Sequence, residues 1–173
     1  MNRLPVVQKY LEQTPAAGAV LLAAMPPRGG LLSPLLWRNL FRLSVNMARS
    51  DLRRSFDTPE RCRNVFFSKH TPERTVVQAT PRLSQESTLA ALDMLGGDRV
   101  RLQEVCDTPI LVMGAAEDRI FGAAQVKRTA RRYGTSAVIV DRTGHDMMLE
   151  PTWEFTASHI ATWLRQHCDV SQS

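Results

Sequence analysis

Two short apolar runs near the C-terminal end limit the fold of this 173-residue chain more than any other feature. Ile110–Met113 and Ala137–Val140 are continuously apolar rather than alternating. This pattern is typical of strands that are covered on both faces in a parallel sheet. Parallel neighbours need a crossover connection, and the helical pattern over Ala123–Tyr133 supplies one. The sequence therefore predicts an α/β unit of strand, helix and strand.

A polar residue follows each of these two runs. Asp118 follows the first in the segment GAAEDRIF, and His145 follows the second in the segment DRTGHDMMLEP. The carboxyl ends of parallel strands share one edge of the sheet, where open α/β sheets build ligand sites, so the two side chains could meet. Contact between an aspartate and a histidine fixes the imidazole tautomer and stabilises its cation, which a general base needs. Each residue alone is equally compatible with a capping or solvated loop position.

These two loops resemble the C-terminal part of the α/β-hydrolase superfamily, in which the catalytic acid follows the seventh strand and the histidine follows the eighth. The resemblance implies that Asp118 is the catalytic acid and His145 the catalytic base of a serine-type hydrolase of ester or related acyl bonds. The adjacent Glu117 and Asp146 are assigned to the rim of the site. A small acyl ester is the implied substrate. The family's hydrolases typically need no cofactor, so no cofactor-binding or metal-binding residue is expected.

The first 30 residues extend the resemblance. Val6–Gln13 has the apolar spacing of a short helix, and Ala19–Ala23 has the composition of a buried strand. The two segments resemble the helix after the family's nucleophile elbow and the sixth strand that follows it. The elbow itself, with its motif G-x-S-x-G, would come before them. That motif occurs nowhere in the sequence.

The other serines and cysteines fit the position of a nucleophile poorly. Ser33 is followed by Pro34 and lacks a strand leading tightly into it. Ser136 and Cys106 each precede a predicted strand and so belong to the wrong edge of the sheet. The remaining candidates lie in helical or linker stretches: Ser44, Ser50, Ser55, Ser68, Ser84 and Ser87. The sequence therefore predicts an acid and a base without a recognisable nucleophile, and a chain that is weak or inactive as a hydrolase alone.

The segment 31–100 contains several short helical patterns separated by prolines. Thr58 and Thr71, each followed by proline, are helix start signals, and Gly96-Gly97 ends the last helix. This arrangement resembles the helical cap that follows the sixth strand in many α/β-hydrolases. Apolar residues here either line an acyl pocket or pack the cap against the sheet: Met25, Leu31, Leu32, Leu35, Leu36, Trp37, Phe41, Phe66 and Phe67.

The expected fold is α/β: a partial α/β-hydrolase fold with a short parallel sheet of about three strands, flanking helices and a helical cap. It forms a single truncated domain over residues 1–173, with 31–100 as the cap subdomain. Without the nucleophile strand, Ala19–Ala23 would be a bare apolar edge, which is a template for pairing with another chain. The alternative function is thus a non-catalytic interaction protein. Its expected partner is a second copy or a complementing N-terminal chain.

Charge and cysteine usage limit the binding partners and the cellular compartment that can be expected. The net charge is +5, and one basic cluster lies on the predicted crossover helix: Lys127, Arg128, Arg131 and Arg132. A solvated helix face explains it, with a phosphate-binding face as the other option, and without interleaved aromatics no nucleic-acid partner is expected. Cys62, Cys106 and Cys168 lack metal-site spacing and suggest free thiols in a reducing compartment. The longest apolar run, Ala16–Met25, is too short to span a bilayer, so a cytoplasmic protein is expected.

Overall fold

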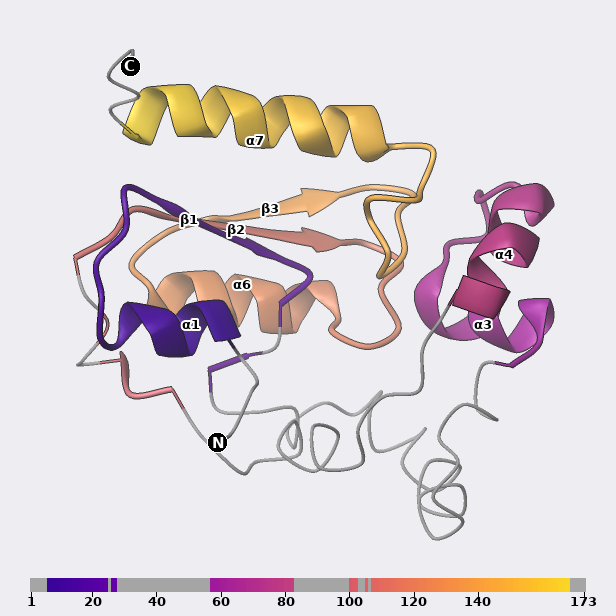
Figure 1. The fold of residues 1–173 in the computed structure, drawn as a ribbon, viewed down its shortest axis with the longest axis horizontal. Helices are drawn as coiled ribbons and strands as arrows, with labels where there is room; N and C mark the ends of the chain where they lie inside the picture. Colours follow the sequence, from indigo (N-terminus) through magenta and orange to yellow (C-terminus); the bar gives the residue numbers. More distant parts are fainter. Residues whose placement is uncertain are drawn as a thin grey trace, which may run out of the picture.

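The computed structural model describes residues 6–24, 26–27, 57–82, 100–102, 105 and 107–168. In chain order its elements are α1 (Val6–Leu11), β1 (Ala19–Leu22), α3 (Pro59–Phe66), α4 (Glu73–Ala79), the 3-10 helix η3 (Thr80–Arg82), β2 (Ile110–Ala115), α6 (Ala123–Arg132), β3 (Ala137–Val140) and α7 (Trp153–His167). Figure 1 shows a sheet between two helical layers, with α7 on one face and α1 and α6 on the other.

The three strands form one parallel sheet in the order β1-β2-β3. Ala19 of β1 lies beside Ile110 of β2, and Val112 of β2 lies beside Ala137 of β3. The predicted α/β class, with three parallel strands and flanking helices, is confirmed. The crossover helix was expected over Ala123–Tyr133 and is observed one residue shorter.

The central strand is buried on both faces, as its continuous apolar sequence predicted. Every residue of β2 is buried. Ile110 and Val112 pack in a cluster with α6 residues, whereas Leu111 and Met113 pack in a second cluster against α7. Alternate residues of β2 thus belong to two separate hydrophobic cores, one on each face of the sheet.

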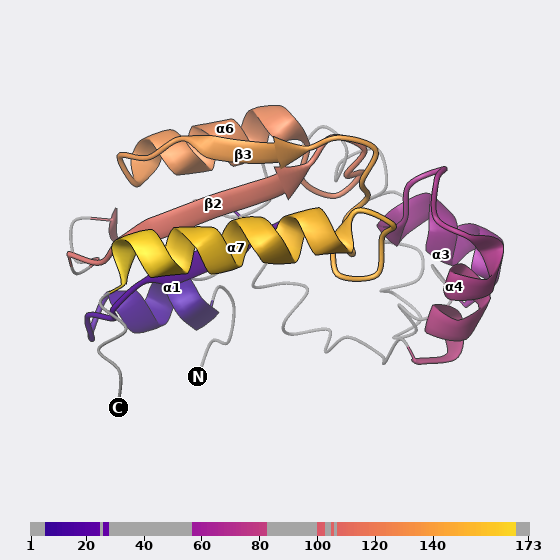
Figure 2. The same ribbon diagram turned by 90° about the horizontal axis from the view of Figure 1, so that it is seen from above.

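Helices α3 and α4 lie beyond the carboxyl ends of β2 and β3, apart from the layers that cover the sheet (Figures 1 and 2). The predicted start of α3 is confirmed, because the Arg61 amide donates to Thr58 Oγ1 at 3.3 Å and Pro59 is the first helical residue. The two helices share a small core, formed by Cys62, Phe67, Val76 and Ala79. Phe67 is therefore a packing residue.

Most of the predicted cap lies outside the described residues, so its limits stay a prediction. The same is true of the helix end at Gly96-Gly97 and of most of the apolar residues considered for an acyl pocket: Met25, Leu31, Leu32, Leu35, Leu36, Trp37 and Phe41. Within the described part of the chain, no helix combines the length and apolar character needed to cross a membrane.

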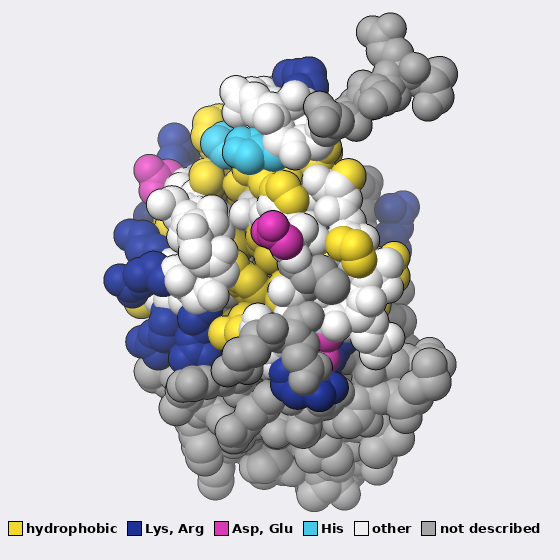
Figure 3. All heavy atoms as spheres, turned by 90° about the vertical axis from the view of Figure 1, so that its left-hand side faces the viewer, with side chains coloured by type: hydrophobic (Ala, Val, Ile, Leu, Met, Phe, Trp, Pro, Cys, Tyr) yellow, Lys and Arg dark blue, Asp and Glu magenta, His cyan; other side chains and the backbone are white. Residues whose placement is uncertain are grey.

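The basic cluster lies on the outer surface of α6. Lys127, Arg128 and Arg131 are exposed, whereas Val126 and Ala130 of the same helix are buried against the sheet. Figure 3 shows Lys and Arg side chains gathered along one flank of the molecule. This distribution agrees with a solvated helix face.

Candidate active site

The loop that follows β2 positions Asp118 through its own backbone. The Asp118 side chain has no exposed surface. Its Oδ1 atom accepts hydrogen bonds from the Ile120 amide at 2.7 Å and the Phe121 amide at 2.9 Å. Two backbone donors on one oxygen hold the carboxylate in a single orientation and leave the second oxygen for another partner.

That partner is His145, in the loop that follows β3. Its Nδ1 atom lies 2.9 Å from Asp118 Oδ2. Because an ionised carboxylate can only accept, Nδ1 carries the proton and neutral His145 has an unprotonated Nε2 atom. Nε2 has no hydrogen-bond partner among the described residues, and 21% of the side chain is exposed. The two loops leave adjacent strands at the same sheet edge, as the sequence indicated.

Two aromatic rings lie beside the imidazole. The Phe66 ring centroid is 6.2 Å from that of His145, and the Phe121 centroid is 5.9 Å away, both in tilted arrangements. Phe66 ends α3, and Phe121 belongs to the loop of Asp118. The sequence did not single out Phe121. Its position three residues after Asp118 is the signal that was available.

The two acidic neighbours of the pair differ in environment. Glu117 is partly exposed and pairs with His70, with 3.3 Å between Oε1 and Nε2. The assignment of Glu117 and Asp146 to the rim stays a prediction. Asp146 is only partly exposed, and burial raises the pKa of its carboxyl. His145 opposes that rise in pKa, while the charges of Glu150 and Asp118 add to it.

The nucleophile candidates that the structure describes are unsuitable. Ser68 is buried, and its hydroxyl donates to Glu150. Ser136 precedes β3 and so lies at the sheet edge opposite His145. Cys62 was not a candidate in the sequence, and as a free thiol without exposed surface it is unsuitable too, because burial raises its pKa and disfavours the reactive thiolate. The other candidates lie outside the described residues: Ser33, Ser44, Ser50, Ser55, Ser84, Ser87 and Cys106.

The described residues contain no group of three or more His, Cys, Asp or Glu side chains arranged to hold a metal ion. Glu150 is the residue at this edge that the sequence analysis missed. It is fully buried in the loop of His145 and accepts four hydrogen bonds. A charged residue within the segment MMLEP was the only available signal, and its partners are distant in sequence.

Sequence comparison finds one family. The model of the alpha/beta hydrolase family matches residues 5–157 of the chain. Among curated protein sequences, none matches.

Solved structures share the fold at low sequence identity. BpoC from Mycobacterium tuberculosis H37Rv has a TM-score of 0.68 and 17% identity, over 92% of this chain and 62% of that protein. A thermophilic esterase from Thermogutta terrifontis has a TM-score of 0.59 and 19% identity, over 93% of this chain and 60% of the esterase. The esterase EaEST from Exiguobacterium antarcticum has a TM-score of 0.63 and 15% identity, over 90% and 61%. The chain thus spans about three fifths of the length of these structures.

Proposed function

The chain belongs to the alpha/beta hydrolase family, and on this basis we propose that it holds the acid and the base of a serine-type hydrolase of ester or related acyl bonds. Asp118 is the proposed acid and His145 the proposed base. One observation supports this above all others: the 2.9 Å contact between Asp118 Oδ2 and His145 Nδ1. Two structures with the same fold are described as esterases, which favours an ester substrate.

The geometry suits proton transfer at Nε2. This atom would take the proton of a nucleophile as it attacks the ester carbonyl, and would then return a proton to the leaving group. Asp118 holds the proton on Nδ1 and stabilises the imidazolium that forms. The nucleophile would come from another chain or from an upstream segment. Loss of the nucleophile from such a triad lowers turnover by about 10⁶-fold, so this chain alone is expected to be weak or inactive.

A nucleophile supplied from solution tests the proposal. Methanol is added to the chain with 4-nitrophenyl acetate, and release of 4-nitrophenol is followed. His145 would take the methanol proton, the methanol oxygen would attack the carbonyl, and 4-nitrophenolate would leave, so that methyl acetate is formed. A positioned general base contributes about 10²- to 10⁴-fold. Because methanol is not positioned by the protein, we expect a smaller methanol-dependent rate, about tenfold above that of His145→Ala.

The matched control is His159→Ala, which removes a histidine from α7 instead. It should keep the methanol-dependent rate of the unmodified chain. Equal methanol dependence in the unmodified chain, His145→Ala and Asp118→Ala would contradict the assignment of the base and the acid.

The edge of the sheet supports a second candidate function, association with another chain. β1 is an edge strand of the described sheet. The Ala19 and Ala23 amides both donate to residues of the β2 segment. Since successive residues of a strand alternate, the backbone groups of Val20 and Leu22 face away from β2 and have no strand partner in the described part of the chain. Such an edge can pair with a second copy or with a complementing chain.

A proline substitution at an outward-facing amide of β1 tests this second candidate function. Val20→Pro removes a donor on the free side of β1 and leaves the bonds to β2 in place. Val20→Ala is the matched control, because it loses the side chain but keeps the amide. Size-exclusion chromatography with light scattering should show a concentration-dependent oligomer for the unmodified chain and Val20→Ala, and a monomer for Val20→Pro. A monomeric unmodified chain at all concentrations would exclude association through this edge.

A further inference from the structure

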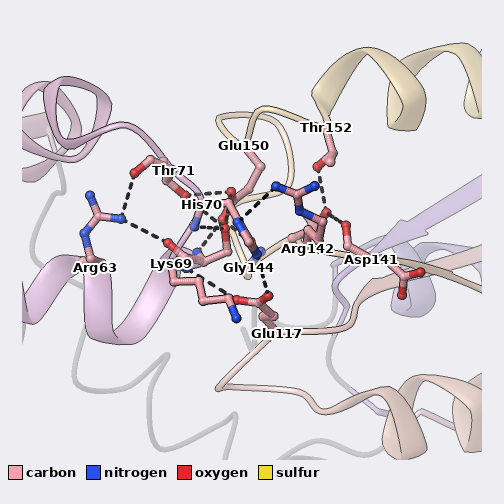
Figure 4. A network of polar contacts seen from close by, with 12 residues as sticks. Arg63, Lys69, His70, Thr71, Glu117, Asp141, Arg142, Gly144, Glu150 and Thr152 are labelled. Carbon is pink, nitrogen blue, oxygen red and sulfur yellow. Dashed lines mark hydrogen bonds and ion pairs between the residues drawn. The ribbon is translucent and has the colours of Figure 1, made fainter.

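A fully buried carboxylate lies in the same loop as His145. Glu150 Oε1 accepts from the Ser68 amide at 2.6 Å and the Gly144 amide at 2.9 Å. Glu150 Oε2 accepts from the Ser68 hydroxyl at 2.8 Å and the Thr71 hydroxyl at 2.7 Å. Each oxygen therefore receives two hydrogen bonds, which offset the cost of removing the charge from water. Figure 4 shows Glu150 where the loop of His145 meets the segment from α3.

That segment, residues 66–71, runs from the last residue of α3 toward α4 and is called the strap below. It contacts the loops of both proposed catalytic residues. On the His145 side, the Asp146 amide donates to the Phe66 carbonyl at 3.0 Å. On the Asp118 side, Glu117 accepts from the Lys69 amide at 3.4 Å and pairs with His70. The strap thus connects the acid loop to the base loop.

The conformation of the strap is itself fixed from α3. One guanidinium nitrogen of Arg63 donates to the Ser68 carbonyl at 3.1 Å and to the Thr71 carbonyl at 2.8 Å. The other nitrogen pairs with Glu73 at the start of α4, at 2.7 Å. These bonds point the Ser68 and Thr71 donors toward the loop of His145.

The contact between strap and loop is closest at Gly144, the residue before His145. A Cβ atom on Gly144 would lie 2.6 Å from the Phe67 carbonyl carbon and from the Ser68 nitrogen, and 2.7 Å from Glu150 Oε1. No side chain fits there without moving a backbone. The strap, Glu150 and the peptide next to His145 are therefore packed as one unit.

From this geometry we propose that Glu150 is a positioning residue for His145. It holds the Gly144 amide against the strap, and so keeps the imidazole within hydrogen-bond distance of Asp118. Without Glu150, four buried donors would lose their acceptor, and the loop would separate from the strap to let water reach them. The inference rests on the proposed function only in taking the Asp118–His145 pair as the site.

If Glu150 has only a structural role, its removal should lower stability and leave the His145 tautomer unchanged. If it positions His145, its removal should change that tautomer in a protein that still folds. The tautomer of His145 separates the two, and NMR of the full chain with ¹⁵N-labelled histidine reports it. The unmodified chain should hold the proton on Nδ1. In Glu150→Ala the proton should distribute between Nδ1 and Nε2, and the Gly144 amide should exchange with solvent at least about tenfold faster.

Two further variants complete the test. Glu150→Gln is the conservative rescue, because its oxygen can accept from both amides while its NH₂ group donates to the Ser68 and Thr71 hydroxyls, which can rotate to accept. It should keep the Nδ1 tautomer. Glu154→Ala, an exposed carboxylate on α7, is the matched control and should change nothing. Folding of each variant is checked by circular dichroism.

A folded Glu150→Ala protein with His145 still fully in the Nδ1 form would overturn the inference. If that variant does not fold, Glu150→Asp keeps the charge but shortens the side chain, so that the carboxylate no longer reaches the Gly144 amide. An unchanged tautomer in a folded Glu150→Asp protein would then overturn the inference in the same way. If the unmodified chain itself lacks the Nδ1 tautomer, the Asp118–His145 pair and the proposed function fail instead.

Discussion

The two oxygens of Asp118 have different tasks. Oδ1 accepts from the Ile120 and Phe121 amides, whereas Oδ2 lies 2.9 Å from His145 Nδ1, whose proton we propose it holds in place. A substitution that keeps the first task and changes the second should separate folding from proton transfer. Asparagine does this, because its oxygen can replace Oδ1 while its NH₂ group faces the histidine.

We expect Asp118→Asn to lower the free energy of unfolding by about 1 kcal/mol, the cost of one weakened hydrogen bond, in urea denaturation. The amide would donate to Nδ1 and force the proton of His145 onto Nε2, so the variant should lose the methanol-dependent rate. Asp118→Ala leaves two loop amides without an acceptor and should cost more, about 2–4 kcal/mol. A folded Asp118→Asn protein with an undiminished rate would contradict this division of tasks.

Asp146 should make folding depend on pH. Burial raises the pKa of its carboxyl, so the folded chain binds this proton more tightly than the unfolded chain. Between the two pKa values, its contribution to stability therefore falls as pH rises. Relative to the unmodified chain, Asp146→Asn should gain stability above about pH 4, the ordinary value for aspartate, and gain none below it. Urea denaturation across pH measures the difference, and a pH-independent difference would contradict the prediction.

At the scale of elements, the positions of the strands were predictable from their short apolar runs. Their burial was predicted correctly only for β2, because β3 is mostly half-buried and β1 alternates between buried and half-buried residues. Ile110–Met113 was expected as a two-sided strand, and the observed β2 extends to Ala115. A Cβ atom at Gly114 would lie 2.6 Å from Val126 Cγ2, so the strand packs closely against α6 at this added position. The start of α3 was readable from Thr58 and Pro59, which are also local signals.

The strap was not predictable from sequence. Ser68 and Thr71 are 82 and 79 residues away from Glu150, and nothing in their local sequence indicates that they face a carboxylate. The contrast between local and distant contacts also explains which site residues were predictable. The loops of Asp118 and His145 were identified because each follows a recognisable strand, whereas the residue that joins them to α3 depends on tertiary packing.

The close packing of two elements at Gly144 leads to a third prediction. Gly144→Ala should lower the free energy of unfolding by about 1–3 kcal/mol, because the strap and the loop must move apart. Gly134→Ala is the control: its φ of 68° is unfavourable for alanine, but a Cβ there meets no atom within 4 Å. Both should lose stability in urea, yet only Gly144→Ala should disturb the His145 tautomer. Equal effects of both variants on that tautomer would contradict the packing argument.

At the scale of the whole molecule, the core is well formed while several large apolar side chains remain exposed. Val6, Val7 and Tyr10 of α1 are 59%, 45% and 55% exposed, and Trp153 and Phe155 of α7 are 50% and 56% exposed. These helices cover opposite faces of the sheet (Figure 1). Together with the edge of β1, which has no second strand partner among the described residues, this surface agrees with the proposed association with another polypeptide.

The central proposal is that Asp118 and His145 are an acid and a base in a sequence that carries no recognisable nucleophile motif. Incubation of the purified, folded chain with a fluorophosphonate, followed by mapping of any modified residue, tests it most directly. His145→Ala is the control, since the base is needed to activate a serine. The account predicts no stoichiometric labelling of either protein. Stoichiometric labelling of one serine in the unmodified chain, lost in His145→Ala, would contradict it and show that the chain is a complete hydrolase.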